Sequence, residues 1–251
     1  MTLKPNGIND YTGITIDFET GGLDCTKCAI TEIALNAFRV KDLKMVDRLC
    51  MQIYPYRKKV KRRLKKKGEE EVGEMMEYQD RALEYSNITM EELENNGIDI
   101  KEAGDRACQF IERNTFGRGY KNRPFFLGQN IQFDLGFWAQ FMDYSDNTNV
   151  ASKLLDGNKD YWGNFQPHYL DTIDVAKMIF GNDPHIDKYK LENIAERLGF
   201  TMFDAHDAQA DTDATFNVYA SATSKLRSGS GVVDDGAIYQ QEKLRDSKFK
   251  I

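Results

Sequence analysis

Residues 13–19 read Gly-Ile-Thr-Ile-Asp-Phe-Glu, the clearest strand signal in the chain. Apolar residues alternate there with Thr15, Asp17 and Glu19, which is the period of a β-strand. Asp17 and Glu19 are therefore expected to share one face at the end of a buried strand. Carboxylates this close repel each other unless a cation lies between them, and an all-oxygen site favours Mg²⁺ or Mn²⁺. The alternative is an ordinary strand end that runs into a turn at Gly21-Gly22.

A second segment, residues 125–130, reads Phe-Phe-Leu-Gly-Gln-Asn and predicts a short buried strand that closes in a glycine turn. A helix is expected next, because phenylalanine recurs every fourth residue at 133, 137 and 141. Asp134 lies one position off this apolar stripe, in the first helical turn. It is a candidate metal ligand, although an acidic residue also stabilises a helix N-terminus without any metal.

The third segment follows a helical pattern over residues 189–198 that ends at Gly199. A short loop then carries Asp204 and His206, and a second helix is expected to begin near Asp207 and to carry Asp211 inward. Five residues along a helix correspond to about 140° of rotation, so His206 and Asp211 cannot share a helical face. We therefore expect His206 on the loop. Four carboxylates and one imidazole in three segments suit an enzyme that binds two divalent cations and hydrolyses a phosphodiester.

These segments resemble the three motifs of the DEDDh 3′-to-5′ exonucleases, the family of the proofreading epsilon subunit of bacterial DNA polymerase III. The matching stretches are Asp-Phe-Glu-Thr at 17–20 with Gly22-Leu23, residues 128–134, and His-Asp-Ala-Gln-Ala-Asp at 206–211. Residues 30–35 and 169–172 resemble two further strands of that family, so the likeness covers roughly residues 11 to 225. It implies a ribonuclease H-like fold.

The resemblance implies roles for single residues. Two divalent cations, Mg²⁺ or Mn²⁺, would be held by Asp17, Glu19, Asp134 and Asp211, and His206 would act as the general base. The tyrosine branch of the superfamily would place its base at Asp207 of this chain, so the chain falls in the histidine branch.

The resemblance also points to substrate contacts from Thr20, Leu23 and Asn130. Leu23 resembles the apolar residue that packs near the terminal base, although a core leucine would give the same sequence. The family often has Thr at the position of Gly21 and His at that of Gln129, so the 3′-end pocket is expected to differ in detail.

The order of the elements predicts an α/β fold. Strand patterns near residues 13, 31, 45, 125 and 168 alternate with helical patterns near 101, 132, 173, 188 and 207, which indicates a mixed β-sheet flanked by helices. With 251 residues and 41% hydrophobic content, one exonuclease domain over residues 1–227 is expected. Residues 228–251 begin Ser-Gly-Ser-Gly and predict a flexible linker and tail, either disordered or partner-binding.

Charge is unevenly distributed along the chain. The net charge is −6, yet residues 57–67 carry nine basic and no acidic side chains, so the remainder sums to −15. The run begins a charged insertion over residues 57–80. Lys58, Lys61 and Arg62 are candidates for contacts with substrate phosphates. The alternatives are a solvated surface segment or, in a eukaryotic source, a nuclear localisation signal.

Other features exclude some functions. Cys25 and Cys28 form a C-x-x-C pair, but no second close pair accompanies it, so free thiols are favoured over a zinc or redox site. His168 and His185 are not expected to contact substrate. No apolar run reaches the length of a membrane span and the N-terminus lacks a signal-peptide core, so a cytoplasmic protein with no membrane partner is expected.

The sequence thus predicts a 3′-to-5′ exonuclease that acts on single-stranded or frayed DNA 3′ ends and releases nucleoside 5′-monophosphates. An exoribonuclease of the oligoribonuclease or RNase T type is the alternative enzyme. A non-catalytic nucleic-acid-binding module with the same fold is disfavoured, because binding alone does not need four converging carboxylates. The partners expected are single-stranded DNA or RNA 3′ ends and a polymerase or other replication protein.

Overall fold

The computed structural model describes residues 11–59, 73–117, 119–181, 183, 188–200 and 207–228. A five-stranded mixed sheet in the order β3-β2-β1-β4-β7 forms its centre, and a two-stranded hairpin, β5-β6, stands beside it. The strands are β1 (Thr12–Thr20), β2 (Ile30–Arg39), β3 (Lys44–Gln52), β4 (Phe125–Gly128), β5 (Gly157–Lys159), β6 (Phe165–Pro167) and β7 (Tyr169–Asp171). The α/β prediction and its five strand positions are confirmed.

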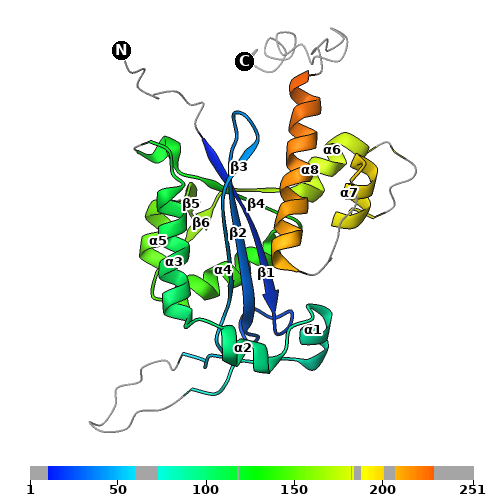
Figure 1. The fold of residues 1–251 in the computed structure, drawn as a ribbon. Helices are drawn as coiled ribbons and strands as arrows, with labels where there is room; N and C mark the ends of the chain where they lie inside the picture. The colour runs from blue at the N-terminus through cyan, green and yellow to red at the C-terminus, as the bar shows by residue number, and fades with distance from the viewer. Residues whose placement is uncertain are drawn as a thin grey trace, which may run out of the picture.

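Strand direction brings the predicted motifs to one edge. β1 is antiparallel to β2 and parallel to β4, and β4 is parallel to β7. The carboxyl ends of β1, β4 and β7 therefore lie at the same end of the sheet, which is where open α/β folds place their functional residues. In Figure 1 this end lies next to α1 and α2.

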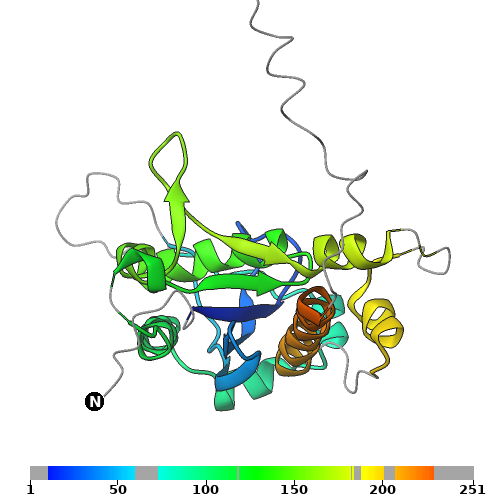
Figure 2. The ribbon, with the colours of Figure 1, turned by 90° about the horizontal axis from the view of Figure 1, so that it is seen from above.

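Helices cover both faces of the sheet (Figures 1 and 2). They are α1 (Asp80–Tyr85), α2 (Met90–Asn96), α3 (Ile100–Arg113), α4 (Gln132–Tyr144), α5 (Thr148–Leu154), α6 (Thr172–Phe180), α7 (Leu191–Leu198) and α8 (Ala208–Ser228). The five helical patterns expected from the sequence are confirmed as α3, α4, α6, α7 and α8. The short elements α1, α5 and β5-β6 were not predicted, because three to seven residues give too little periodicity.

The alternation along β1 divides the side chains between two layers. Ile14, Ile16 and Phe18 are buried in the main core with apolar residues of α3 and α4. The opposite face of the sheet packs against α8, where Phe38 and Tyr219 lie 5.2 Å apart by ring centroids. Within the described residues, no helix is both long and apolar enough to cross a bilayer.

Two predicted segments extend beyond what the structure describes. Residues 60–72 of the charged insertion and residues 229–251 of the tail lie outside the described residues. The proposed domain limits at 227 and 228 therefore stay predictions.

Candidate metal centre

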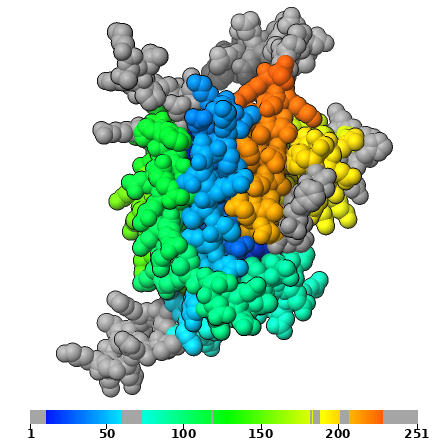
Figure 3. Space-filling view, viewed as in Figure 1, coloured from blue at the N-terminus to red at the C-terminus, as the bar shows by residue number. Residues whose placement is uncertain are grey.

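The end of β1 carries two acidic side chains on one face, as predicted. Asp17 and Glu19 are half-buried, whereas Phe18 between them is 4% exposed and points into the core on the other face. Figure 3 shows the end of β1 (dark blue) at the surface between the first turn of α8 and the α1-α2 segment. The two carboxylates are therefore accessible at the open end of the sheet.

Asp211 completes a cluster of three carboxylates. It lies in the first turn of α8, and its backbone N–H donates to the Asp207 carbonyl at 2.9 Å. One carboxylate oxygen each from Asp17, Glu19 and Asp211 lies within 4.8 Å of the other two. Among the described residues, this is the one group of three or more such side chains close enough to share a metal ion.

Asp134 reaches the same end of the sheet from the first turn of α4. Its side chain is 3% exposed, and Oδ1 accepts a hydrogen bond from the Phe18 N–H at 3.1 Å. Because Phe18 lies between Asp17 and Glu19 in β1, this bond fixes Asp134 beside both carboxylates. A role limited to stabilising the helix N-terminus does not explain a buried charge tied to the neighbouring strand.

The electrostatics of the cluster fit a cation. Burial and then the charges of Asp17 and Asp211 raise the pKa of Glu19 to about 9. Burial also raises the pKa of Asp17 and Asp134 above the usual range, and like charges add to the effect. Carboxylates that repel each other in a partly buried site are stabilised by a hard divalent cation, for which oxygen donors are the preferred ligands. The residues present thus fit Mg²⁺ or Mn²⁺.

Three further acidic or aromatic side chains lie near the cluster, and two of them, Glu32 and Tyr85, were not singled out in the sequence. Glu32 on β2 pairs directly with Glu19 across the sheet and accepts hydrogen bonds from the Cys50 thiol and the Ala208 N–H. The side chains of Asp207 and Tyr85 also lie within electrostatic reach of the carboxylates. Tyr85 is 65% exposed. Only the alternation within residues 30–35 offered a signal for Glu32, and no local pattern marks Tyr85.

The predicted substrate-contacting residues occupy different environments. Thr20 is buried, and its Oγ1 donates to the Gly22 carbonyl at 2.8 Å, which closes the turn after β1. Leu23 is 85% exposed, so its interpretation as a core leucine is wrong. Asn130 is exposed with a φ of 54°, and its N–H donates to Asp171 Oδ1 at 3.1 Å.

The two departures from the family pattern have structural reasons. A side chain at Gly21 would place Cβ 2.4 Å from the Glu77 carbonyl oxygen, which leaves no room for threonine without movement of the backbone. Gln129 Nε2 donates to the Tyr189 carbonyl at 2.8 Å, and its Oε1 accepts from the Thr172 hydroxyl. Gln129 therefore connects β4 to α6 and to the segment before α7.

Several predicted residues lie elsewhere. His206, Lys61, Arg62 and His185 lie outside the described residues. Lys58 lies at the beginning of the charged insertion, where its N–H donates to the Glu74 carbonyl at 2.7 Å. Cys25 and Cys28 are free thiols, and among the described side chains they belong to no group close enough together to share a metal ion. His168 Nδ1 is 3.0 Å from Asp156 Oδ2, so this histidine pairs with a carboxylate that is not one of the four of the cluster.

Comparisons with known proteins agree with this geometry. The model of the exonuclease family (RNase_T) matches residues 14–219. A search of curated proteins finds no significant match. Among solved structures, Escherichia coli exonuclease I in complex with a dA16 oligonucleotide matches with a TM-score of 0.61 and 18% identity over 87% of this chain and 41% of that one. A moderately thermophilic exonuclease I from Methylocaldum szegediense matches with a TM-score of 0.59, 18% identity and the same coverage. The chain thus spans about two fifths of the length of these proteins.

Proposed function

Since the chain belongs to the exonuclease family, as a DEDDh-type 3′-to-5′ exonuclease with a ribonuclease H-like fold, we propose that it shortens single-stranded or frayed DNA from the 3′ end. Each turnover adds one water to a phosphodiester, breaks the bond from phosphorus to the 3′ oxygen, and releases a nucleoside 5′-monophosphate. The observation that carries this proposal is the cluster of Asp17, Glu19 and Asp211 within 4.8 Å, with Asp134 fixed to the same strand.

The four carboxylates together would hold two divalent cations, Mg²⁺ or Mn²⁺. When bound, such cations supply positive charge that activates water and offsets the charge of the phosphate and leaving group. Asp17 and Glu19 offer oxygen atoms from one rigid strand. Asp134 and Asp211 approach from two helices on opposite faces of the sheet.

His206 lies two residues before the start of α8 at Ala208 and is the proposed general base. A neutral imidazole accepts the proton of the attacking water at a ring nitrogen, and an unperturbed histidine titrates close to neutral pH. Its place five residues before Asp211 leaves it free to approach the water from the loop while Asp211 contacts the metal.

Exposed side chains near the end of β1 suit contacts with the last nucleotide. Leu23 and Tyr85 are 85% and 65% exposed, and an apolar side chain and an aromatic ring both favour a base over water. Asn130 offers an exposed amide at the same end of the sheet, and Thr20 supports the turn that carries Leu23. Lys58, Lys61 and Arg62 are proposed to contact phosphates further along the strand.

DNA is proposed over RNA because the likeness to the proofreading subunit favours it, and because the exonuclease I structures hold DNA oligonucleotides. We propose in the same way a domain over residues 1–227, a flexible linker and tail over residues 228–251, a polymerase or replication partner, and a cytoplasmic location.

Timed digestion of 5′-labelled DNA and RNA of matched sequence, with Mg²⁺, Mn²⁺ or a chelator, tests this function. We expect a ladder of products shortened from the 3′ end, faster on DNA, and no products with chelator. Asp17→Asn preserves the shape of the side chain but removes a charge, and it should lower the rate by at least about 100-fold with the fold intact. A near wild-type rate for this variant at saturating Mg²⁺ would contradict the metal assignment. If the wild-type chain digests RNA faster than DNA, RNA is the preferred substrate and the proposal of DNA is wrong.

A further inference from the structure

The β5-β6 hairpin presents two aromatic side chains that contact each other but are almost fully exposed. Tyr161 is 93% exposed and Trp162 is 80% exposed, and their ring centroids are 5.7 Å apart at an angle of 90°. Figure 2 shows the hairpin projecting away from the sheet and the helices. Exposed tryptophan and tyrosine side by side are costly in water, which indicates that the tip binds something.

The tip is ordered by its own hydrogen bonds. Asp160 Oδ1 accepts from the N–H groups of Trp162 and Asn164 at 2.9 and 2.8 Å, and Asp160 Oδ2 accepts from Asn164 Nδ2 at 3.1 Å. Gly163 adopts a φ of 87°, which a residue with a side chain rarely does. The turn therefore holds the two rings before any ligand arrives, which reduces the entropy lost on binding.

The root of the hairpin is anchored as firmly. The Tyr120 hydroxyl donates to the Gly157 carbonyl at 2.5 Å, and the N–H of His168 donates to the Asp156 carbonyl at 2.9 Å. The Asp156 side chain also accepts from the Tyr11 hydroxyl at 3.0 Å. These contacts tie the hairpin to β1 and to the segment before β4, so the tip keeps a fixed place relative to the sheet.

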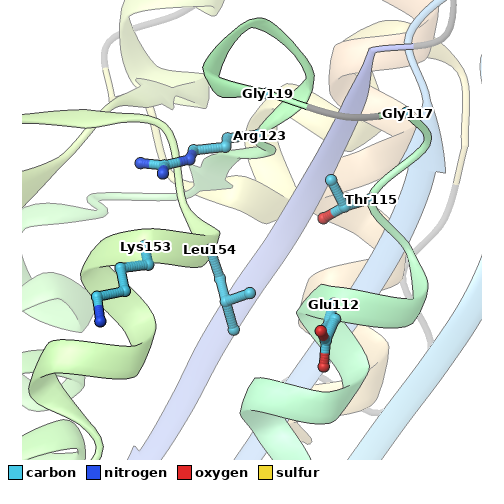
Figure 4. A pocket seen from close by; sticks show the side chains of 7 residues that line it. All are labelled: Glu112, Thr115, Gly117, Gly119, Arg123, Lys153 and Leu154. Carbon is cyan, nitrogen blue, oxygen red and sulfur yellow. The ribbon is translucent and has the colours of Figure 1, made fainter.

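Basic side chains occur on β5 of the hairpin and on the segments next to its root. Residues 119–123 and 148–168 carry four basic residues, Lys121, Arg123, Lys153 and Lys159, against two acidic ones. Both acidic side chains, Asp156 and Asp160, are engaged in the hydrogen bonds of the hairpin. In Figure 4, Arg123 and Lys153 line a cavity of about 240 Å³ and point away from Glu112 on its other side. Aromatic rings and positive charge together match the bases and phosphates of single-stranded nucleic acid.

The edge of the sheet connects this surface to the metal centre. β7 is the edge strand next to β4 and begins one residue after His168, and its Tyr169 and Leu170 are 42% and 40% exposed. The Tyr169 hydroxyl accepts from Gln132 Nε2 at 2.5 Å, and Gln132 lies two residues before Asp134. Ten residues separate Tyr161 from Asp171 at the carboxyl end of β7. At the rise of an extended strand this is at most about 33 Å, a span that several nucleotides can cover.

We propose that Tyr161 and Trp162 form a second contact for single-stranded nucleic acid, on which bases upstream of the 3′ end stack while the 3′ end lies at the metal centre. This inference rests on the proposed function, because it takes the same strand as the ligand of both sites. Lys159 and Arg123 would contact the phosphates between stacked bases. Stacking tolerates any base sequence, which suits a strand that is shortened one nucleotide at a time.

Binding of labelled oligonucleotides of about 4 and about 20 nucleotides to the Asp17→Asn chain tests the second contact, because the shorter one cannot reach from the metal centre to the tip. Tyr161→Ala with Trp162→Ala should weaken binding of the longer oligonucleotide about 10- to 100-fold and leave the shorter one within about 2-fold. Tyr161→Phe with Trp162→Phe keeps both rings and should stay close to the parent. Met178→Ala removes another apolar side chain, 75% exposed, from α6 and serves as the surface control.

Tryptophan fluorescence provides an independent readout. The chain has two tryptophans, and Trp138 is 3% exposed, so quenching by the longer oligonucleotide should come from Trp162 and disappear in Trp162→Phe. An unchanged affinity of the alanine variant for the longer oligonucleotide, or an equal loss for both lengths, overturns the inference and leaves a protein partner as the ligand of the tip. Absence of 3′-end digestion by the wild-type chain contradicts the proposed function instead, so the two failures are distinguishable.

Discussion

α4 and α8 each bring one carboxylate to the end of β1, but different contacts hold the two helices. α4 is anchored by aromatic packing, since Phe141 is fully buried and its ring lies 6.2 Å from that of Phe18. The Asp134 carboxylate on α4 is bonded directly to the Phe18 backbone. One strand residue thus holds both the helix and its carboxylate.

α8 also packs aromatic side chains on Phe38 of β2, but its first turns are held in addition by polar contacts around one buried amide. Asn36 on β2 is fully buried, and its Nδ2 donates to Thr212 Oγ1 and Asp213 Oδ1, both at 2.9 Å. Gln209 Nε2 donates to Asn36 Oδ1 at 3.0 Å. Hydrogen bonds are more directional than apolar contacts, so this network sets the rotation of α8 and hence the direction of Asp211. The difference suggests that stability depends mainly on the α4 side and precise catalytic geometry on the α8 side.

The largest effect is expected at His206, two residues before the start of α8. His206→Ala should lower the rate about 10² to 10⁴-fold, because the attacking water loses its proton acceptor. The wild-type rate should rise with pH through the ionisation of an imidazole, at about pH 6.5 for an unperturbed side chain, and the variant should lose this dependence. Single-turnover rates between pH 5 and 9 measure both. A variant with the wild-type rate and pH profile would assign the base to another group.

A pair of substitutions compares the two anchors directly. Phe141→Leu removes part of a packed ring and should destabilise the fold by about 1–2 kcal/mol, with a rate at saturating substrate within about 2-fold of wild type. Asn36→Ala leaves buried partners unsatisfied and should cost about 1–3 kcal/mol as well, yet reduce that rate about 10-fold because Asp211 is misdirected. Denaturant unfolding and single-turnover kinetics provide the two readouts. Equal rates for both variants would remove the distinction between the helices.

A bound Mg²⁺ is expected to connect α8 to β1, because Asp211 of α8 lies close to the carboxylates of β1. The raised pKa of Glu19, about 9 against an ordinary 4.5, means that its contribution to stability is complete below about pH 4.5 and is lost as pH rises through 9. The melting temperature without metal should therefore fall over this range. Mg²⁺ at 100 times its Kd should raise the free energy of unfolding by about 2.7 kcal/mol and so raise the melting temperature again.

Hydrogen exchange of the same samples can localise the metal effect. We expect Mg²⁺ to slow exchange in the first turns of α8, whereas α4 should change little because the Phe18 bond already holds it. Asp17→Asn provides the control and should show little metal-dependent stabilisation at any pH. A Mg²⁺ effect spread equally over both helices would contradict the view that α8 is the side that the metal fixes.

The sequence predicted the parts of this molecule that local periodicity determines. The alternation in residues 13–19 predicted β1 and the shared face of Asp17 and Glu19, and the phenylalanine spacing predicted α4. Partners that depend on tertiary contact were missed, such as Glu32, whose position opposite Glu19 is set by the pairing of β1 with β2. Asn36 likewise gave no signal, because a polar residue inside an apolar strand is explained only once α8 covers it. Tyr161 and Trp162 lie in a hairpin too short for its period to be recognised.

The smallest effect is expected from the basic run, whose described residues 57–59 include a contact with the end of α4. Lys59 Nζ lies 3.5 Å from Asp143 Oδ1 and 2.8 Å from Asp146 Oδ1, at the end of α4. If Lys58, Lys61 and Arg62 contact phosphates, replacing all three by Gln should reduce the slope of log K against log salt by about 2 for single-stranded DNA. The single-turnover rate at saturation should stay within about 2-fold, because the contacts proposed for these residues are to phosphates further along the strand than the scissile one.

Binding of the Asp17→Asn chain at several salt concentrations, with and without the triple substitution, measures the slope. Lys44→Gln, Lys190→Gln and Lys225→Gln together remove the same charge from positions outside the run and serve as the matched control. The loss should be greater for long oligonucleotides than for dinucleotides, which cannot reach both the run and the metal centre. An unchanged slope would mean that the basic run does not contact the phosphates of the substrate and instead faces solvent or binds another partner. The α4 side of the molecule would then support catalysis only through its packing and through Asp134.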